Sequence, residues 1–210
     1  MRQKRQETHA PGLLRRLLER LEGREQMLLR GHPSWPLLLL SYPANHLHVA
    51  EELREAWLHT LPSLKAPVAA DYREMLAHLP AVVVVVLRPR NVCDCLGHHH
   101  PRGAESRLAK RLAHDMGSEV GEIDLAWEAI RAWRPQPLSS LAAGEGFAVL
   151  HFHVALLAVL LHELEHLAHP DRQESAVRRT SDSFYSSVLD ELVSQDGVTR
   201  FGMNIRPVAP

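Results

Sequence analysis

The longest apolar stretch of the chain runs from Gly146 to Leu161 and contains no proline and no formal charge. It leads into LLHELEHLAHP at residues 160–170, where Pro170 interrupts the pattern. Proline cannot continue a helix, because it lacks an amide hydrogen and clashes with the preceding turn. The pattern therefore predicts a helix of about 22 residues, apolar nearly all round and hence central to the fold.

Two shorter segments have the patterns of β-strands. Residues 81–90, AVVVVVLRPR, contain five consecutive valines, whose branched side chains favour extended backbone over helix. Continuous apolarity of this kind predicts a strand that is buried on both faces. Residues 122–127, EIDLAW, alternate polar and apolar side chains, which predicts a strand with one exposed face.

Apolar residues recur at helical spacing in much of the remaining chain. This spacing predicts helices over residues 12–30, 45–61, 66–79 and 105–116. Residues 171–180 and 181–195 are predicted to form one broken helix or two consecutive helices, with Ser181 or Asp182 as the cap at the break. Residues 35–42, WPLLLLSY, fit a buried strand or a helical turn equally well. The expected fold class is α+β, mostly helical.

The sequence His162-Glu163-Leu164-Glu165-His166 is an HExxH motif in the last turns of the predicted central helix. Residues four apart project from the same side of a helix, so His162 and His166 can bind one metal ion. Glu163 is turned about 100° from His162, which allows it to reach a water molecule at the metal. Chance alone would give such a match in about one chain in ten of this composition, and histidines hydrogen-bonded within a core are the alternative.

The order of strands and helices around this motif resembles that of small zincins, metallopeptidases with HExxH on a central helix beneath a short sheet. The resemblance covers residues 81–195. Residues 122–127 resemble the edge strand that zincins have just above the metal, and SDSFY at residues 181–185 is similar to the stretch that follows HExxH in the ImmA/IrrE group of gluzincins. The resemblance implies a zincin-like domain at residues 81–210 with an N-terminal helical extension at residues 1–80, or one compact unit.

Two positions depart from the patterns of these families. Zincins usually have uncharged residues between the glutamate and the second histidine, whereas this chain has Glu165 there. Peptide deformylases have an acidic residue in that place, in HExDH, but this chain lacks their other two motifs. Thr180 stands where ImmA/IrrE proteins have their glutamate ligand. The third ligand must therefore come from another residue, or the site is incomplete.

Catalytic zinc takes three protein ligands and leaves its fourth position to water, so the site needs a third side chain. Glu174 follows the turn after Pro170, and an antiparallel return of the chain would bring it beside His166. Four other residues are alternatives, although the carboxylates among them can equally be capping or solvated groups: Asp182, Asp190, Glu191 and His169.

The resemblance implies zinc-dependent hydrolysis of peptide bonds in a peptide or protein substrate. Glu163 would be the general base that takes a proton from the attacking water and passes it to the leaving amine. Tyr185 or a histidine would stabilise the oxyanion, and the substrate would pair with the edge of residues 122–127. Two alternatives remain: a zincin-like regulatory or binding protein that holds metal without constitutive activity, and a helical interaction protein with a chance motif.

Charge and composition narrow the choice of partners and location. The formal net charge is -1 and the sequence pI is about 7.0, which gives no reason to expect binding to nucleic acid. The first residues lack the apolar segment of a secretory signal. The longest apolar run contains His151 and His153, which is untypical of a membrane span. We therefore expect a cytoplasmic protein without a membrane partner.

A second group of potential metal ligands lies in the loop after the valine-rich strand. Cys93 and Cys95 are closely followed by His98-His99-His100, and such a loop could bind a metal ion. The two cysteines are too close along the chain for an ordinary disulfide, and their spacing differs from the C-x2-C of structural zinc sites. A solvated histidine-rich loop is the alternative.

Overall fold

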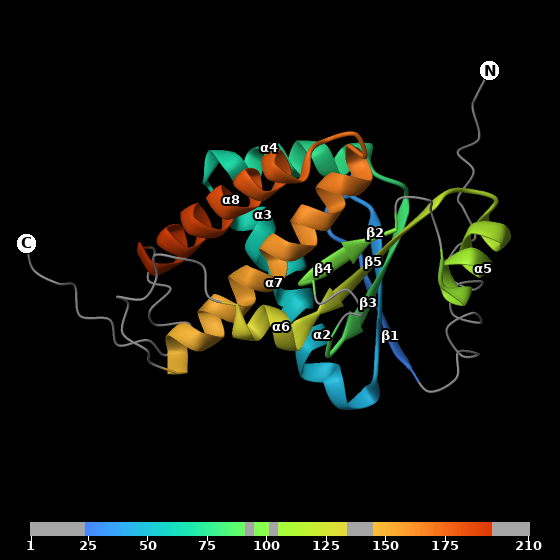
Figure 1. Ribbon diagram of the computed structural model, residues 1–210, viewed down its shortest axis with the longest axis horizontal. Coiled ribbons are helices and arrows are strands. Elements are labelled where there is room, and N and C mark those ends of the chain that lie inside the picture. Colours follow the sequence, from blue (N-terminus) through green and yellow to red (C-terminus); the bar gives the residue numbers. More distant parts are fainter. Residues whose placement is uncertain (1–23, 91–94, 101–104, 134–144, 195–210) are drawn as a thin grey trace, which may run out of the picture.

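The fold combines a five-stranded mixed β-sheet with helices on both of its faces, so the chain is of the α+β class as expected (Figure 1). The computed structural model describes residues 24–90, 95–100, 105–133 and 145–194. The strand order is β1-β2-β3-β5-β4. In chain order the strands are β1 (Glu25–Leu29), β2 (Leu37–Tyr42), β3 (Val82–Arg88), β4 (Gly97–His99) and β5 (Val120–Ala126). Strands β2, β3 and β5 are parallel, whereas β1 and β4 pair antiparallel with their neighbours.

The helices differ greatly in length, and the two longest form the HExxH segment and the chain that follows it. In chain order the helices are α2 (Leu47–Glu55), the π-helical turn η2 (Ala56–Thr60), α3 (Leu61–Ser63), α4 (Pro67–Met75), α5 (Arg107–Met116), α6 (Trp127–Ala132), α7 (Glu145–Ala168) and α8 (Glu174–Ser194). Two short 3-10 turns, η1 (Ala44–His46) and η3 (Leu76–His78), precede α2 and follow α4.

Strand β3 lies in the middle of the sheet and is buried on both faces, which confirms the interpretation of the valine run. Val83 and Val85 pack into the larger core, which includes α7 and α8. Val82, Val84 and Val86 face the opposite way and pack against apolar residues of α5. Of the described helices, α5 alone covers this second face, as Figure 1 shows. The sheet therefore separates two cores.

The predicted central helix is α7, which extends through the HExxH motif to Ala168 and packs antiparallel with α8 in the larger core. The segment Phe147–Ala168 is long and apolar enough to cross a membrane, but 78% of its most apolar stretch is buried inside the protein. Neighbouring elements thus cover its apolar surface. The absence of a membrane partner and the cytoplasmic location stay predictions.

The first part of the chain contains strands as well as helices. The helices predicted over residues 45–61 and 66–79 are confirmed, and residues 35–42 form the buried strand β2. The helix predicted over residues 12–30 is wrong at residues 25–29, which form β1; residues 12–23 lie outside the described part. Pairing with β2 satisfies the backbone of this segment and buries Leu29, so tertiary contact outweighs helix propensity.

Residues on both sides of position 80 contribute to the sheet and to the larger core. The division into residues 1–80 and 81–210 stays a prediction. Trp57 and Tyr72 from the first segment share this core with Leu160 and Phe184 from the second. The site described below therefore depends on contacts with both segments.

Three expectations about the second half are wrong. Residues 122–127 lie in β5 and α6, and β5 is not the edge strand, because β4 pairs along its outer side. The polar side of β5 is also not exposed, since Glu122 is 2% exposed. Helix α8 continues without a break through Ser181, whose hydroxyl bonds to the carbonyl of Arg178 instead of capping a new helix.

Candidate metal centre

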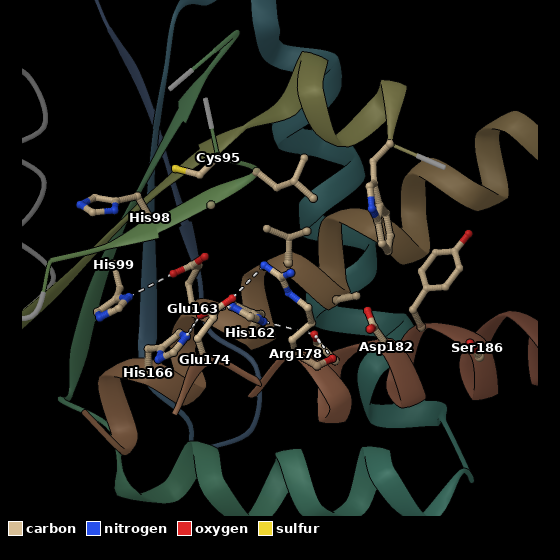
Figure 2. A pocket seen from close by; sticks show the side chains of 17 residues that line it. Cys95, His98, His99, His162, Glu163, His166, Glu174, Arg178, Asp182 and Ser186 are labelled. Atoms are coloured by element: carbon tan, nitrogen blue, oxygen red, sulfur yellow. Dashed lines mark hydrogen bonds and ion pairs between the residues drawn. The ribbon is translucent and has the colours of Figure 1, made fainter. Parts of the chain in front are cut away.

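Three side chains with metal-ligating atoms converge where α7 ends and α8 begins. The ligand atoms of His162, His166 and Glu174 all lie within 4.8 Å of one another. Oε2 of Glu174 is 2.9 Å from Nε2 of His166 and 3.6 Å from Nε2 of His162. Figure 2 shows the two imidazoles and the carboxylate turned toward a common point. Two nitrogens and one carboxylate oxygen form a donor set that suits catalytic zinc.

The position of Glu174 follows from the tight turn between the helices. Chain reversal after Ala168 starts α8 at Glu174, so the carboxylate lies at the positive end of the helix dipole. A buried network holds this turn. Glu165 is 1% exposed and accepts hydrogen bonds from Tyr72, at 3.0 Å, and from Arg172 in the turn.

This network explains the unusual acidic residue inside the HExxH motif. Burial raises the pKa of the Tyr72 hydroxyl, and the charge of Glu165 raises it further, so the hydroxyl stays protonated and donates. Glu165 points away from the metal-ligating atoms, toward α4 and the turn. It fixes the geometry that brings Glu174 to the histidines.

Ser181 on α8 orients the first histidine of the motif. Its hydroxyl donates to the carbonyl oxygen of Arg178 at 2.9 Å and lies 3.2 Å from Nδ1 of His162. Because the only hydrogen of the hydroxyl is used, the Ser181 oxygen accepts the hydrogen of Nδ1. When the ring is neutral, Nε2 of His162 is then left with a lone pair that faces Glu174. This is the tautomer that a metal ion requires.

Glu174 has the charge that a cation site needs. Partial burial acts to raise the pKa of its carboxyl, but His162, His166 and then Arg178 lower the pKa by more. The net pKa lies below the ordinary value, so the group is ionised at neutral pH. Arg178, one turn along α8, also donates to Oε1 at 3.1 Å, while Oε2 faces the histidines.

The general-base candidate Glu163 lies against the edge strand β4. It is 6% exposed, and its Oε2 is 3.2 Å from Nδ1 of His99. The ring of His99 stacks on His166, with 4.7 Å between the ring centroids and 11° between the planes. Gly97 provides the space for the carboxylate, since a Cβ there would be 2.6 Å from Oε1 of Glu163. The strand therefore packs directly on the motif (Figure 2).

These residues line a cavity of about 1000 Å³. Its polar lining includes the histidines and carboxylates together with Arg178 and Asp182. Its apolar lining consists of Leu96, Trp133, Ala158, Val159 and Tyr185. The hydroxyl of Tyr185 is 2.5 Å from Nδ1 of His151, so it already has a buried partner. Its expected role as an oxyanion donor stays a prediction.

The other candidate ligands lie apart from the three converging side chains. Asp182 lines the cavity but is not in the ligand cluster. Glu191 accepts hydrogen bonds from the backbone amides of Lys65 and Ala66, in front of α4. Asp190 and His169 are exposed and also do not belong to the cluster.

Thr180, which stands where ImmA/IrrE proteins have their glutamate ligand, also takes no part in the cluster. Its hydroxyl bonds to the carbonyl of Ala176 within α8.

Sequence reasoning did not find the roles of Gly97, His99 and Ser181. The run of three histidines is a partial signal for His99, although the sequence suggests for it only a separate loop metal site or a solvated loop. Strand β4 separates these histidines, because alternate side chains project from opposite faces of a strand. Cys95 is disulfide-bonded, so the expectation that it forms no disulfide is wrong and it offers no thiolate; Cys93 lies outside the described residues.

Comparisons with known proteins do not assign this chain to a family. No protein-family model, no curated protein and no solved structure matches it. The chemistry of the site therefore has to follow from its own residues.

Proposed function

We propose that the chain is a zinc-dependent peptidase of the zincin type, with His162, His166 and Glu174 as the ligands. The observation that carries the proposal is the convergence of two imidazoles and one ionised carboxylate in a cavity large enough for substrate. The donor set fits zinc, and the orientation of His162 by Ser181 supports the fit. A helix-borne HExxH beside a strand at the sheet edge supports the zincin arrangement.

Zinc bound by these residues would lower the pKa of a water molecule to about 7 and polarise a substrate carbonyl. Glu163 takes a proton from the attacking water and delivers it to the leaving amine. Its neighbours Gly97 and His99 hold the carboxylate at the cavity wall. Their contacts exclude bulk water from one side of the base.

The substrate pairs with β4, the edge strand beside the motif helix. The amide of His100 donates to the carbonyl of Glu122, and the amide of Ala126 donates to that of Leu96. Because alternate residues of an antiparallel ladder bond to the partner strand, the backbone groups of Gly97 and His99 point away from it. An extended peptide can add to these groups beside the catalytic residues.

The apolar lining of the cavity suits an apolar side chain of the substrate. Trp133, Val159 and Tyr185 belong to this lining. We therefore expect peptides with an aromatic or aliphatic residue next to the cleaved bond to react faster than those with a charged one.

The experiment combines zinc analysis with hydrolysis of a peptide library. Purified protein should hold about one zinc at this site, and His162→Ala with His166→Ala should remove it. Glu163→Gln should keep zinc and reduce hydrolysis about 10²- to 10⁴-fold. Glu128→Gln, at a half-exposed carboxylate of α6, is the matched control and should change neither.

Each measurement can refute a separate part of the proposal. If the protein holds no zinc at His162 and His166 after supplementation, the metal site is wrong. If Glu163→Gln cleaves as fast as the parent, the assigned base is wrong. If zinc is bound but no peptide is cleaved, the regulatory alternative replaces the peptidase. The low exposure of Glu163 and its contact with His99 are the observations that favour that alternative.

A further inference from the structure

A second cluster of metal-ligating side chains lies on the opposite face of the same two strands. The ligand atoms of His100, Glu122 and Asp124 are within 4.8 Å of one another. Pairing of β4 with β5 sets His98 opposite Asp124, and the amide of His100 donates to the carbonyl of Glu122. These side chains face α5, whereas His99 faces α7. The cluster is therefore separated from the HExxH site by the sheet.

Glu122 is a buried carboxylate in mainly apolar surroundings. It is 2% exposed, and the smaller core lies next to it around Val84 and Val120. Its Oε2 accepts hydrogen bonds from the amides of Glu105 and Ser106, at 2.7 and 2.8 Å, just before α5. A buried carboxylate is costly unless charges and hydrogen bonds compensate it. Two amides satisfy one oxygen, and no lysine or arginine of the described residues forms an ion pair with this carboxylate.

His100 places its Nε2 beside the two carboxylates. This nitrogen is buried, has no hydrogen-bond partner among the described residues, and lies 3.4 Å from Oδ2 of Asp124. The other ring nitrogen, Nδ1, is 3.2 Å from a carboxylate oxygen of Glu105. In the neutral tautomer with its hydrogen on Nδ1, the lone pair of Nε2 faces an acidic pair. A cation between these groups removes that repulsion.

We propose that His100, Glu122 and Asp124 bind a second divalent transition-metal ion, with Zn²⁺ as its probe. One imidazole and two carboxylates suit Zn²⁺ or Mn²⁺, and the imidazole disfavours Mg²⁺ and Ca²⁺. Glu105, 3.2 Å from Nδ1 of His100, would hold the ring by the nitrogen that does not bind the metal, as carboxylates do at metal sites. The ion ties β4 to β5 and to the start of α5, and so fixes the strand that borders the peptidase site.

The competing explanation is a protonated His100 that forms an ion pair with Asp124. In that case the imidazolium itself supplies the cation, and no metal binds. Arg88 does not remove the need for a cation beside Glu122, because it pairs with the other oxygen of Asp124, at 3.1 Å. Metal stoichiometry distinguishes the two explanations.

The test uses the full chain with His162→Ala and His166→Ala, which lacks the first site. Titration with Zn²⁺ by calorimetry, and elemental analysis after dialysis, should find about one bound ion in this background. Adding Asp124→Asn, which keeps the shape, should weaken that binding by more than the roughly 10- to 100-fold loss typical of outer-shell changes. Adding His114→Gln, at an imidazole 88% exposed on α5, is the matched control and should leave binding unchanged.

The proposal is overturned if the background protein binds no zinc, or if Asp124→Asn and His114→Gln have the same effect. A second measurement does not depend on the folding of the variant without the two motif histidines. The otherwise unchanged chain should bind two zinc ions, and the chain with Asp124→Asn alone should bind one. Two ions in that variant would also refute the site. None of these results depends on peptide hydrolysis, so the second metal site and the proposed peptidase fail or succeed separately.

Discussion

Ser181→Ala tests whether the orientation of His162 contributes to metal binding. The change removes the oxygen that lies 3.2 Å from Nδ1 of His162 and leaves all three proposed ligands intact. Without this acceptor the ring can rotate or adopt the other tautomer, which turns a hydrogen instead of a lone pair toward the site. We expect weaker zinc binding with an unchanged fold.

Loss of an outer-shell partner typically costs about 10- to 100-fold in metal affinity. For Ser181→Ala that range corresponds to about 1.4–2.8 kcal/mol of binding free energy. The fold should tolerate the change, because position 181 lies inside α8, where alanine has a higher helix propensity than serine. The thermal stability of the zinc-free protein should therefore differ little from that of the parent.

The assay is competition with a chelator of known zinc affinity, together with thermal unfolding. Ser186→Ala is the matched control, since Ser186 is on the same helix, lines the same cavity and is not part of the ligand cluster. A double-mutant cycle with His162→Ala sharpens the test, because Ser181→Ala should then have no further effect on zinc affinity. If Ser181→Ala and Ser186→Ala bind zinc as tightly as the parent, or if the cycle is additive, the inferred orientation is wrong.

Three further predictions concern the surroundings of the site. Glu174→Gln should weaken zinc binding more than Ser181→Ala does, whereas Glu191→Gln should leave zinc binding intact. The reverse result in chelator competition would identify Glu191 as the third ligand instead of Glu174. Gly97→Ala should reduce hydrolysis while zinc is retained, because the new Cβ would lie 2.6 Å from the carboxylate of the general base; an unchanged kcat would contradict this. Arg172→Met should lower the free energy of unfolding by about 1–3 kcal/mol, because buried Glu165 loses a charged donor; denaturant unfolding with an unchanged midpoint would refute that role.

The sequence predicts the elements whose pattern is local. The central helix and the valine-rich strand are confirmed, because each is specified by residues adjacent in the chain. The structure also brings together His162, His166 and Glu174. The two histidines are one helical turn apart, and Glu174 follows them after one tight turn, so their proximity depends on local structure alone.

What the sequence did not predict depends on contacts between distant segments. Residues 25–29 have side chains that favour a helix, but they pair with β2 and form a strand of the sheet. His99 lies over the motif because β4 pairs outside β5, and no periodicity within the loop reveals that pairing. The break with Ser181 or Asp182 as its cap is wrong, because α8 is continuous there; the contact of Ser181 with His162, 19 positions earlier, leaves no local signal. In each case tertiary structure decides between local alternatives.

Strand β4 has a consequence for how the chain tolerates insertions and deletions. It contributes Gly97 and His99 to one face of the sheet, and His100 follows on the other. A slip of one residue against β5 would reverse every side chain of the strand. Gly97 would then no longer lie beside Glu163, and His99 would leave His166 and turn toward the acidic pair. A single-residue insertion next to this strand would therefore disturb both sites at once, even though it changes no ligand of the first.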